Sequence, residues 1–373
     1  MKPLHILHTE AAAGWGGQEI RVFQETSLLL ERGHRVSVAC RKGSPLEERC
    51  QSLTDSRFNF ISLAMERMMS PGAFTALYRY IGVISPDIIH THSSVDSWLG
   101  GVAGKLAGVP VVRTRHVSLP VKDFFPNHLI YSCIPERILT SGEAISDIVK
   151  RVRCVDPNKV VSVPAGVDLC RFNATISGNG IREELKVKPD QPLIGKIGVV
   201  RGWKGHDYFL EAIPLIMQQI PDARFVIVGD GPGFEQVKSK AQAAGLEDSV
   251  TLLGHREDVP EIMAALDVQV LASFTGEGTP QVIPQAFAMK APMVATRIAS
   301  IPDLLGNGDR GVLIEPKSAP GIAEGVLKLI KDPELANRLT ENAWSFCRQE
   351  LTVDKMMEAT IAVYEEVMSS SKK

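Results

Sequence analysis

The sequence has no uninterrupted apolar run that approaches the ~18 residues a membrane-spanning helix requires. We therefore expect no membrane span. The N-terminal stretch MKPLHILHTEAA has only a short apolar run, which His5 and His8 interrupt, so it lacks the pattern of a secretory signal. We expect a mature chain that begins near Met1 and stays in the cytoplasm.

Other familiar signatures are also missing. The six cysteines form no C-x-x-C pair and no metal-finger spacing, which indicates scattered, reduced thiols. The chain has no Lys/Arg-rich block and no interleaving of aromatic with basic residues, so we expect no nucleic-acid partner.

The net charge of −2 is unevenly distributed along the chain. Residues 1–171 contain 20 Lys and Arg against 16 Asp and Glu, a net charge of +4, whereas the remainder carries −6. Two interpretations stay open. The asymmetry is ordinary scatter, or the first half faces an anionic acceptor or a membrane surface, which would make the protein peripheral on the inner face of that membrane.

The length of 373 residues, with 44% hydrophobic and 23% charged residues, is typical of a soluble protein with about two domains. In the first half, short β-branched segments alternate with amphipathic patterns such as Gln18–Arg32 and Glu143–Arg153. The predicted strands are 4–9, 35–40, 58–63, 87–92, 109–116, 137–141 and 159–164. Such alternation predicts parallel βαβ units, so the first domain should be doubly wound.

A polar stretch with two glycines, residues 173–190, interrupts the alternation and is predicted to be a linker. Strand patterns then return at 193–200, 223–230, 249–254, 267–273, 292–297 and 311–316, and from Pro333 onward two or three helices are expected. We therefore predict a first domain at 1–172 and a second at 191–351. The fold class is α/β, with two doubly wound, Rossmann-like domains whose strand-end loops face a cleft.

The loop after the first predicted strand, AAAGWGGQE, contains glycines that let backbone N–H groups approach a phosphate at a helix start. It does not match G-x-G-x-x-G, and the second strand ends in Cys40 and Arg41 instead of an acidic residue. Both features argue against a nicotinamide cofactor. A tight turn without a ligand is the alternative interpretation.

Two loops of the second domain place charged residues beside glycines. VVRGWKGHDYF positions Arg201 and Lys204 after a strand, where two cations suit a diphosphate and would offset its charge as a leaving group. In SFTGEGTPQVIPQAFAM, Glu277 precedes an apolar helix that begins near Pro280. The free N–H groups and the dipole of this helix favour an anion at its start. The alternatives are solvated loop cations and a capped helix with an incidental glutamate.

Six segments taken in order carry a family resemblance: GGQE (16–19), PAGVD (164–168), RGWKGH (201–206), VGDGP (228–232), LLGHRED (252–258) and EGTPQVIPQA (277–286). Together they resemble the retaining glycosyltransferases of the GT-B fold, the large family four group, over roughly residues 6–299. The resemblance is greatest to the bacterial branch that acts on lipopolysaccharide, capsule or other surface glycans. It implies a metal-independent enzyme whose first domain binds the acceptor and whose second binds a nucleotide sugar. It also implies a C-terminal helix, about 352–373, that packs back on the first domain.

The resemblance assigns roles to individual residues. His116 and Glu277 would contact the donor sugar, and Arg201 and Lys204 would hold the diphosphate; these four would be the catalytic residues. Other donor contacts, several of them through the backbone, would come from Gly16, Gly17, Gly229, Gly254, His255, Arg256, Thr279, Pro280, Gln281, Val282 and Gln285.

Gln285 departs from the family pattern, which usually has a second glutamate at this position. Its amide can still accept and donate hydrogen bonds to ribose hydroxyls, but it carries no charge. We therefore expect weaker or altered ribose binding, not lost activity.

The histidines allow further interpretations. His116 could be a strand-end histidine that is satisfied by local hydrogen bonds. His90 and His92, in the segment HTH, point to one face of a strand and could ligate a metal. Because no Cys or acidic partner has ligand spacing, we expect no metal site.

The sequence thus predicts a retaining glycosyltransferase that moves a sugar from a UDP- or GDP-linked donor to a glycan or lipid-linked acceptor. The pathway would be lipopolysaccharide, capsule or exopolysaccharide biosynthesis, and no cofactor is expected beyond the nucleotide sugar substrate. Two alternatives stay open: a GT-B-fold sugar-nucleotide epimerase, and a degenerate nucleotide-sugar-binding protein without turnover, for which Gln285 is the only support.

Overall fold

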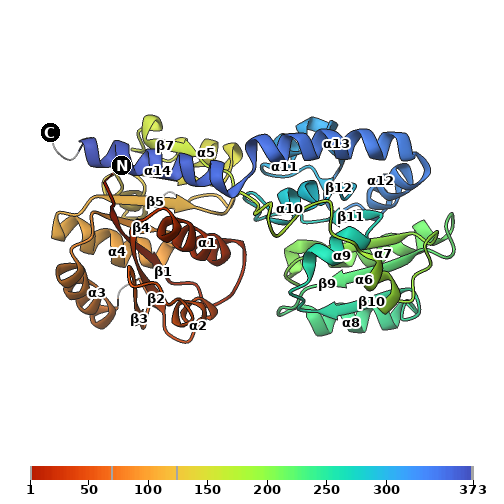
Figure 1. Cartoon of the computed structure of the whole chain (residues 1–373), viewed down its shortest axis with the longest axis horizontal. Helices are drawn as coiled ribbons and strands as arrows, with labels where there is room; N and C mark the ends of the chain where they lie inside the picture. The colour runs from red at the N-terminus through yellow and green to blue at the C-terminus, as the bar shows by residue number, and fades with distance from the viewer. Residues whose placement is uncertain (1, 69, 123–124, 371–373) are drawn as a thin grey trace. The chain divides into compact units, whose positions relative to one another are not determined.

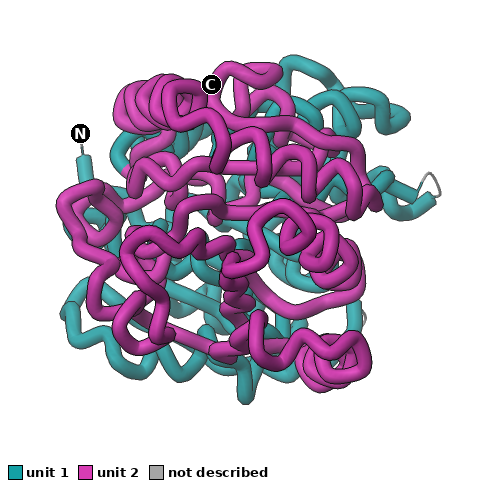
Figure 2. Tube along the Cα trace, turned by 90° about the vertical axis from the view of Figure 1, so that its right-hand side faces the viewer, with its two compact units in different colours: residues 1–164, 354–373 teal, residues 165–353 magenta. Residues whose placement is uncertain are grey.

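The computed structural model describes residues 2–68, 70–122 and 125–370, and it divides into two compact units (Figure 1). Unit 1 comprises residues 1–164 and 354–373, and unit 2 comprises residues 165–353 (Figure 2). Helix α14 (Val353–Ser370) belongs to unit 1 from Asp354 onward. The last residues of the expected C-terminal helix, 371–373, lie outside the described residues.

Unit 1 is built on a seven-stranded parallel sheet with the order β3-β2-β1-β4-β5-β6-β7. Every strand predicted for the first half is confirmed. The strands are β1 (His5–Glu10), β2 (Arg35–Arg41), β3 (Phe58–Leu63), β4 (Ile88–Thr91), β5 (Val111–Arg115), β6 (Arg137–Thr140) and β7 (Val160–Ser162). The helices are α1 (Gly17–Glu31), α2 (Pro45–Gln51), α3 (Pro71–Ile84), α4 (Ser94–Ala107), α5 (Glu143–Lys150) and α14, with short 3₁₀ turns η1 (Asn127–Ile130) and η2 (Pro157–Lys159).

Helices cover both faces of this sheet because its strands are apolar on both sides. Ile6 and Val38 belong to one buried cluster, together with residues of α1 and α14. Leu7 and Ala39, the sequence neighbours of those residues, belong to a second cluster with residues of α3 and α4. Successive side chains of a strand therefore enter different cores, as the period of two requires.

Unit 2 contains a six-stranded parallel sheet with the order β10-β9-β8-β11-β12-β13. The strands predicted for the second half are confirmed as β8 (Leu193–Ile197), β9 (Arg224–Val228), β10 (Val250–Gly254), β11 (Val268–Leu271), β12 (Met293–Thr296) and β13 (Val312–Ile314). The helices are α6 (Asn179–Glu184), α7 (His206–Met217), α8 (Phe234–Ala243), α9 (Val259–Ala265), α10 (Val282–Ala288), α11 (Ile301–Leu304), α12 (Ala319–Lys331) and α13 (Pro333–Glu350), with 3₁₀ turns η3 (Gly202–Lys204) and η4 (Gly306–Gly308).

The linker predicted at 173–190 is wrong, because this segment is part of unit 2 and contains helix α6. Ile181 and Val187 are buried in the unit 2 core. Gly178 is a site of close packing, since a Cβ atom there would lie 2.2 Å from the amide nitrogen of Ala265. The Arg182 guanidinium also donates to the Ala265 carbonyl at 2.7 Å. The first domain likewise ends at Pro164, earlier than the predicted residue 172.

The two C-terminal helices, α13 and α14, have 18 residues each, within the two or three helices predicted after Pro333. The side chains of Met357 and Tyr364 in α14 are fully buried in the unit 1 core. Among the described residues, no helix combines the length and the apolar character needed to cross a bilayer.

In both sheets the strand order reverses next to the first strand of the unit. The reversal lies between β1 and β4 in unit 1 and between β8 and β11 in unit 2. Open α/β sheets bind ligands outside the carboxyl ends of the strands at such a switch point. The loops that follow these four strands are therefore where each unit should carry its site.

Candidate functional site

The loop after β8 is held against the end of β11 by Gly205. This glycine has a φ of 69°, and a Cβ atom there would lie 2.0 Å from the carbonyl oxygen of Ala272. Only glycine fits this turn, so the sequence RGWKGH folds with its basic residues at the carboxyl ends of the central strands. Arg201 is exposed at the start of the loop, with its guanidinium 5.5 Å from the centre of the Trp203 ring.

Lys204 and Glu277, which come from different loops, form an ion pair. Lys204 Nζ lies 2.6 Å from Glu277 Oε1, and the side chains are 20% and 6% exposed. An ammonium group has three donors and a carboxylate several acceptor positions, so both groups can make further hydrogen bonds. The structure therefore brings together the two residues predicted to hold the diphosphate and the sugar of a donor.

Two more basic side chains lie buried beside this pair, and the sequence analysis missed both. Lys196 in β8 is 1% exposed, and burial, together with the nearby Lys204, lowers its pKa to about 7 against the opposing effect of Glu277. His206 is also buried; burial and then Lys196 lower its pKa, and a backbone contact with Arg201 acts in the opposite direction. Lys196 could have been found from the sequence, because a lysine inside an apolar strand segment is unusual and indicates a buried charge.

Unpaired polar atoms gather at the ends of β11 and β12. Ser273 Oγ, Gln281 Nε2 and Ser300 Oγ are buried and have no partner among residues 2–68, 70–122 and 125–370. Buried polar groups in proteins are nearly always hydrogen-bonded. A polar ligand bound after these strands would supply partners for such atoms.

The helix after Glu277 begins two residues later than predicted and is short. Helix α10 begins at Val282 and has only seven residues, so its dipole is small. The amide of Ile283 donates to the Pro280 carbonyl at 3.0 Å, and Pro284 has no N–H group. Thr279 is buried, and Gln285 is half-buried on α10.

Of the glycines predicted to approach the nucleotide, Gly229 lies in a closely packed turn, whereas nothing lies within 4 Å of the Cβ position of Gly254. The amide of Gly229 donates to the Gly254 carbonyl at 2.7 Å, and a Cβ atom on Gly229 would lie 2.1 Å from the carbonyl oxygen of Gly198. These turns join the carboxyl ends of β8, β9 and β10, so any larger residue at Gly229 would displace the neighbouring loop.

The Arg256 side chain forms ion pairs with carboxylates of the protein itself. Its guanidinium bonds to Asp258 at 2.7 Å and to Glu184 at 2.8 Å, so two carboxylates already neutralise its charge. His255 is exposed and lies 3.1 Å from Glu257. A contact of this loop with a nucleotide base would therefore use its backbone, as predicted for residues 254–258.

In the Gly-rich loop of unit 1, a backbone amide is already bonded to the carboxylate of Glu19. Helix α1 begins at Gly17, and the amide of Gly16 donates to Glu19 Oε2 at 2.7 Å. Glu19 is buried, and its carboxylate takes the Gly16 amide in a capping box. A donor phosphate that used the Gly16 amide would have to compete with it.

His116 ends a row of three imidazoles in unit 1. His8 Nδ1 lies 2.9 Å from His92 Nε2, and His92 Nδ1 lies 3.2 Å from His116 Nε2. Burial lowers the pKa of all three rings, so they are neutral near pH 7. A neutral imidazole donates through one nitrogen and accepts through the other, so the row holds His116 in one orientation. Its contact with a sugar stays a prediction.

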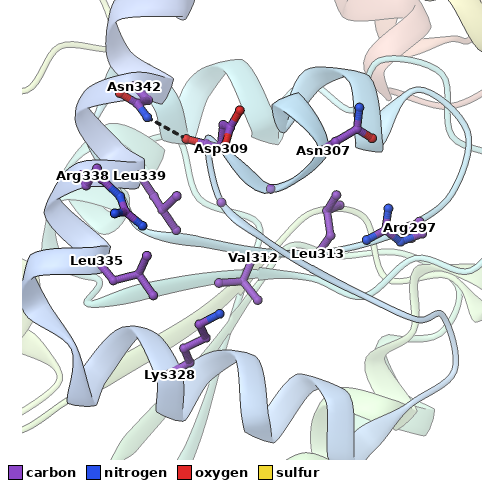
Figure 3. Close-up of a pocket in the computed structure, with 12 residues that line it drawn as sticks. Arg297, Asn307, Asp309, Val312, Leu313, Lys328, Leu335, Arg338, Leu339 and Asn342 are labelled. Atoms are coloured by element: carbon purple, nitrogen blue, oxygen red, sulfur yellow. Dashed lines mark hydrogen bonds between the residues drawn. The ribbon is translucent and has the colours of Figure 1, made fainter.

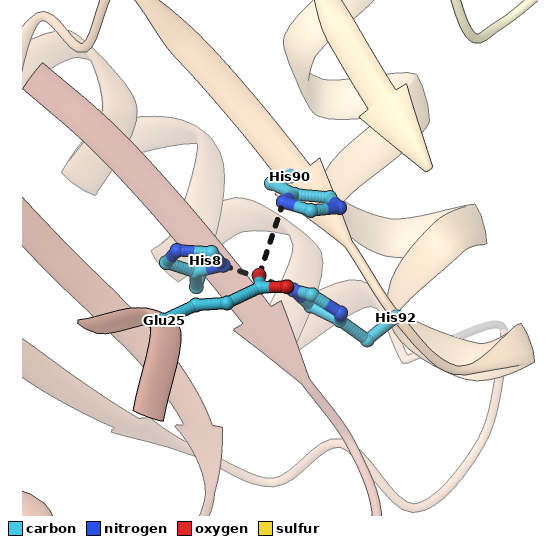
Figure 4. A group of neighbouring side chains, drawn as sticks. All are labelled: His8, Glu25, His90 and His92. Carbon is cyan, nitrogen blue, oxygen red and sulfur yellow. Dashed lines mark hydrogen bonds and ion pairs between the residues drawn. The ribbon is translucent and has the colours of Figure 1, made fainter. Parts of the chain in front are cut away.

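The ligand atoms of His8, Glu25, His90 and His92 lie within 4.8 Å of one another (Figure 4). Several of these atoms are already paired, although His8 Nε2 and Glu25 Oε2 have no hydrogen-bond partner among the described residues. His90 bonds through both nitrogens, to Tyr364 and Thr114, each at 2.6 Å, and Glu25 accepts from Arg21 Nε at 2.7 Å. Because the Arg21 guanidinium also places a positive charge beside the group, this arrangement is poorly suited to a metal ion.

A hollow of about 440 Å³ lies at the β13 edge of the unit 2 sheet (Figure 3). Its basic residues, Arg297, Lys328 and Arg338, are all exposed. It contains none of the predicted site residues and none of the unpaired buried atoms described above. The candidate site of unit 2 therefore lies at the centre of the sheet, not in this hollow.

Comparison with known proteins agrees with this geometry. Residues 15–171 match the family model "Glycosyltransferase Family 4", and residues 179–346 match "Glycosyl transferases group 1". The chain belongs to the family 4 glycosyltransferases. As a member of that group, it is an enzyme that transfers a sugar from a nucleotide sugar.

Two relatives and two structures illustrate the similarity. The UDP-Gal:alpha-D-GlcNAc-diphosphoundecaprenol alpha-1,3-galactosyltransferase of Escherichia coli is 29% identical over 94% of both chains. The N-acetyl-alpha-D-glucosaminyl L-malate synthase of Bacillus anthracis is 25% identical over 77% of this chain and 76% of its own. A glycosyltransferase from Rickettsia africae has a TM-score of 0.87 at 19% identity, covering 99% of each chain. Anabaena HepE in complex with UDP has a TM-score of 0.85 at 19% identity, covering 97% of this chain and 100% of its own. The predicted GT-B fold class is confirmed.

Proposed function

We propose that this glycosyltransferase is a retaining enzyme that transfers a sugar from a UDP-sugar to a glycan or lipid-linked acceptor in surface-glycan biosynthesis. The observation that carries the proposal is the Lys204–Glu277 pair at the switch point of unit 2, with buried Lys196 and His206 beside it. The structures of HepE with UDP and with UDP-glucose support the donor. The name of the E. coli relative, whose acceptor is a diphosphoundecaprenol-linked sugar, supports the acceptor class.

In the proposed reaction, the bond between the anomeric carbon and the diphosphate oxygen breaks, and a bond to the acceptor hydroxyl oxygen forms on the same face. The acceptor proton passes to the departing diphosphate oxygen, so no covalent bond to the protein is needed. Lys204 and Arg201 would stabilise the negative charge that builds on this leaving group. Glu277 would accept hydrogen bonds from the sugar hydroxyls and so hold the donor in position.

Unit 1 would bind the acceptor, with His116 held by its row of imidazoles. A lipid-linked acceptor would place the enzyme peripherally on the inner face of a membrane. The net charge of +4 on residues 1–171 supports such an association with an anionic surface.

Release of nucleotide from a panel of UDP-sugars tests the site directly. We expect Glu277→Ala and Lys204→Ala each to lower the rate of release by about 10²-fold or more, because each removes a group that holds the reacting diphosphate sugar. Glu235→Ala, an exposed residue of α8, is the matched control and should act like the wild type. The proposed site is wrong if both site variants release nucleotide at the wild-type rate.

The same assay separates the proposed transferase from an epimerase. An epimerase would convert the donor alone into an isomeric nucleotide sugar, whereas a transferase needs an acceptor or water. Product analysis by anion-exchange chromatography distinguishes these outcomes.

A further inference from the structure

Two arginines of β5, Arg113 and Arg115, are buried side by side without a counterion. They are 2% and 8% exposed and, being two residues apart in a strand, point to the same face of the sheet. Their hydrogen bonds go to the Tyr131 hydroxyl and to the carbonyls of Ile130 and Leu119. Within the described part of the chain, neither arginine bonds to a carboxylate, and both Nε atoms lack a hydrogen-bond partner.

Asp96 attracts Arg113 electrostatically but makes no hydrogen bond or ion pair with either arginine among the described residues. Its two oxygens accept instead from Thr9, from the His92 amide and from the Ser93 amide. The Tyr131 ring lies 4.1 Å from the Arg113 guanidinium and 5.6 Å from that of Arg115, which offsets only part of the charge.

Such an arrangement is costly to fold. A buried guanidinium loses its hydration, and two like charges this close repel each other in a medium of low dielectric constant. Burial lowers the pKa of Arg113, and Arg115 acts in the same direction. Buried charges in proteins are normally paired, and ionisable groups that are strongly perturbed by burial cluster at functional sites.

The position of Arg113 and Arg115 in the sheet is compatible with binding an anion. Arg115 is the last residue of β5, directly before His116, at the edge of the sheet where ligands of open α/β domains bind, and Arg113 lies two residues earlier in the strand. The planar donor array of arginine matches the oxygens of a phosphate group.

We propose that Arg113 and Arg115 bind a phosphate or diphosphate group of the acceptor substrate. The inference rests on the proposed function and narrows it, because it makes the acceptor an anionic, phosphate-bearing glycan or glycolipid. Lipid-linked and water-soluble acceptors share this chemistry.

Calorimetric titration of the full-length protein with inorganic pyrophosphate and with farnesyl diphosphate tests the proposal. We expect Arg113→Met and Arg115→Met each to weaken binding at this site by about tenfold or more, and Arg115→Lys to retain part of it. Arg79→Met, an exposed arginine of α3, is the matched control and should bind like the wild type. Tighter binding of farnesyl diphosphate than of pyrophosphate would identify the anion source as lipid-linked, and equal binding as a soluble phosphate ester.

Thermal unfolding without ligand separates binding from a structural role. If the pair serves a ligand, Arg115→Met should keep or raise the melting temperature, since it removes an uncompensated buried charge. A large fall in melting temperature in both methionine variants and in Arg115→Lys, with unchanged pyrophosphate affinity per folded protein, would overturn the proposal in favour of loop anchoring.

The titrations are repeated with Lys204→Ala, which removes the proposed donor site of unit 2. If Lys204→Ala and the β5 variants each abolish a separate binding event, both proposals hold. If Lys204→Ala changes nothing while the β5 variants lose binding, the proposed donor site fails and the β5 site stands. Pyrophosphate and farnesyl diphosphate affinities within twofold of the wild type in both methionine variants would refute the β5 site alone.

Discussion

Lys204 Nζ lies 2.6 Å from Glu277 Oε1, which ties the loop after β8 to the loop after β11 across the switch point of unit 2. Each side chain limits the motion of the other, so the two loops present one charged surface. Gly205 makes this contact possible, because any side chain there would collide with the Ala272 carbonyl.

Lys196 should make the stability of the protein depend on pH. Its pKa is about 7 in the folded protein, whereas an unfolded lysine has a pKa of about 10.4. Between these values the unfolded chain binds more protons, so this residue makes the free energy of unfolding rise as the pH increases from about 7 towards 10. We expect Lys196→Met to be more stable than the wild type at pH 6.5, with the gap closing by pH 9.5.

Melting temperatures of the two proteins across this pH range provide the measurement. Lys204, Glu277 and His206 face the same cluster, and Lys196 also lowers the pKa of His206, so the difference between the curves reports Lys196 together with its effect on His206. Parallel curves would contradict a depressed lysine pKa.

Gly178→Ala should destabilise unit 2 by about 1–3 kcal/mol, because the added methyl group would overlap the backbone of Ala265. A flexible linker would tolerate the change. Gly180→Ala is the matched control, since nothing lies within 4 Å of its Cβ position in α6. Alanine favours a helix, so this variant should be neutral or more stable. Equal urea unfolding midpoints for the two variants would mean that the segment is not packed as described.

Gln285→Glu should lower the KM for the UDP-sugar by about tenfold at most, since a carboxylate accepts stronger hydrogen bonds from ribose hydroxyls than an amide does. Gln285→Leu, which keeps the size but removes the polar group, should raise KM. Steady-state kinetics with a fixed acceptor measures both. A carboxylate variant with a higher KM than the wild type would show that residue 285 does not face the ribose.

The strands of both sheets could be predicted from the sequence because their pattern is local. Segments such as LHILHT and ARFVIVGD are short, β-branched and buried on both faces, and turn residues bound them. Arg201, Lys204 and Glu277 could be predicted as site residues because they follow such strands, and strand ends are where α/β sheets bind ligands.

Other features depend on contacts between residues that are distant in the sequence. The stretch 173–190 is polar and contains glycine, yet it packs on α9 because Gly178 permits close approach. Glu19 competes with a phosphate at Gly16 only because the first turn of α1 folds it back onto that amide.

The sequence by itself thus determined the two parallel α/β sheets and the family, since hydrophobic periodicity and ordered loop motifs are properties of short segments. Only the tertiary structure decided which charges lie buried together. Lys196 with His206, and Arg113 with Arg115, look like ordinary basic residues in the sequence. Their chemistry arises from the loss of water and of counterions, which follows from the packing of strands and helices around them.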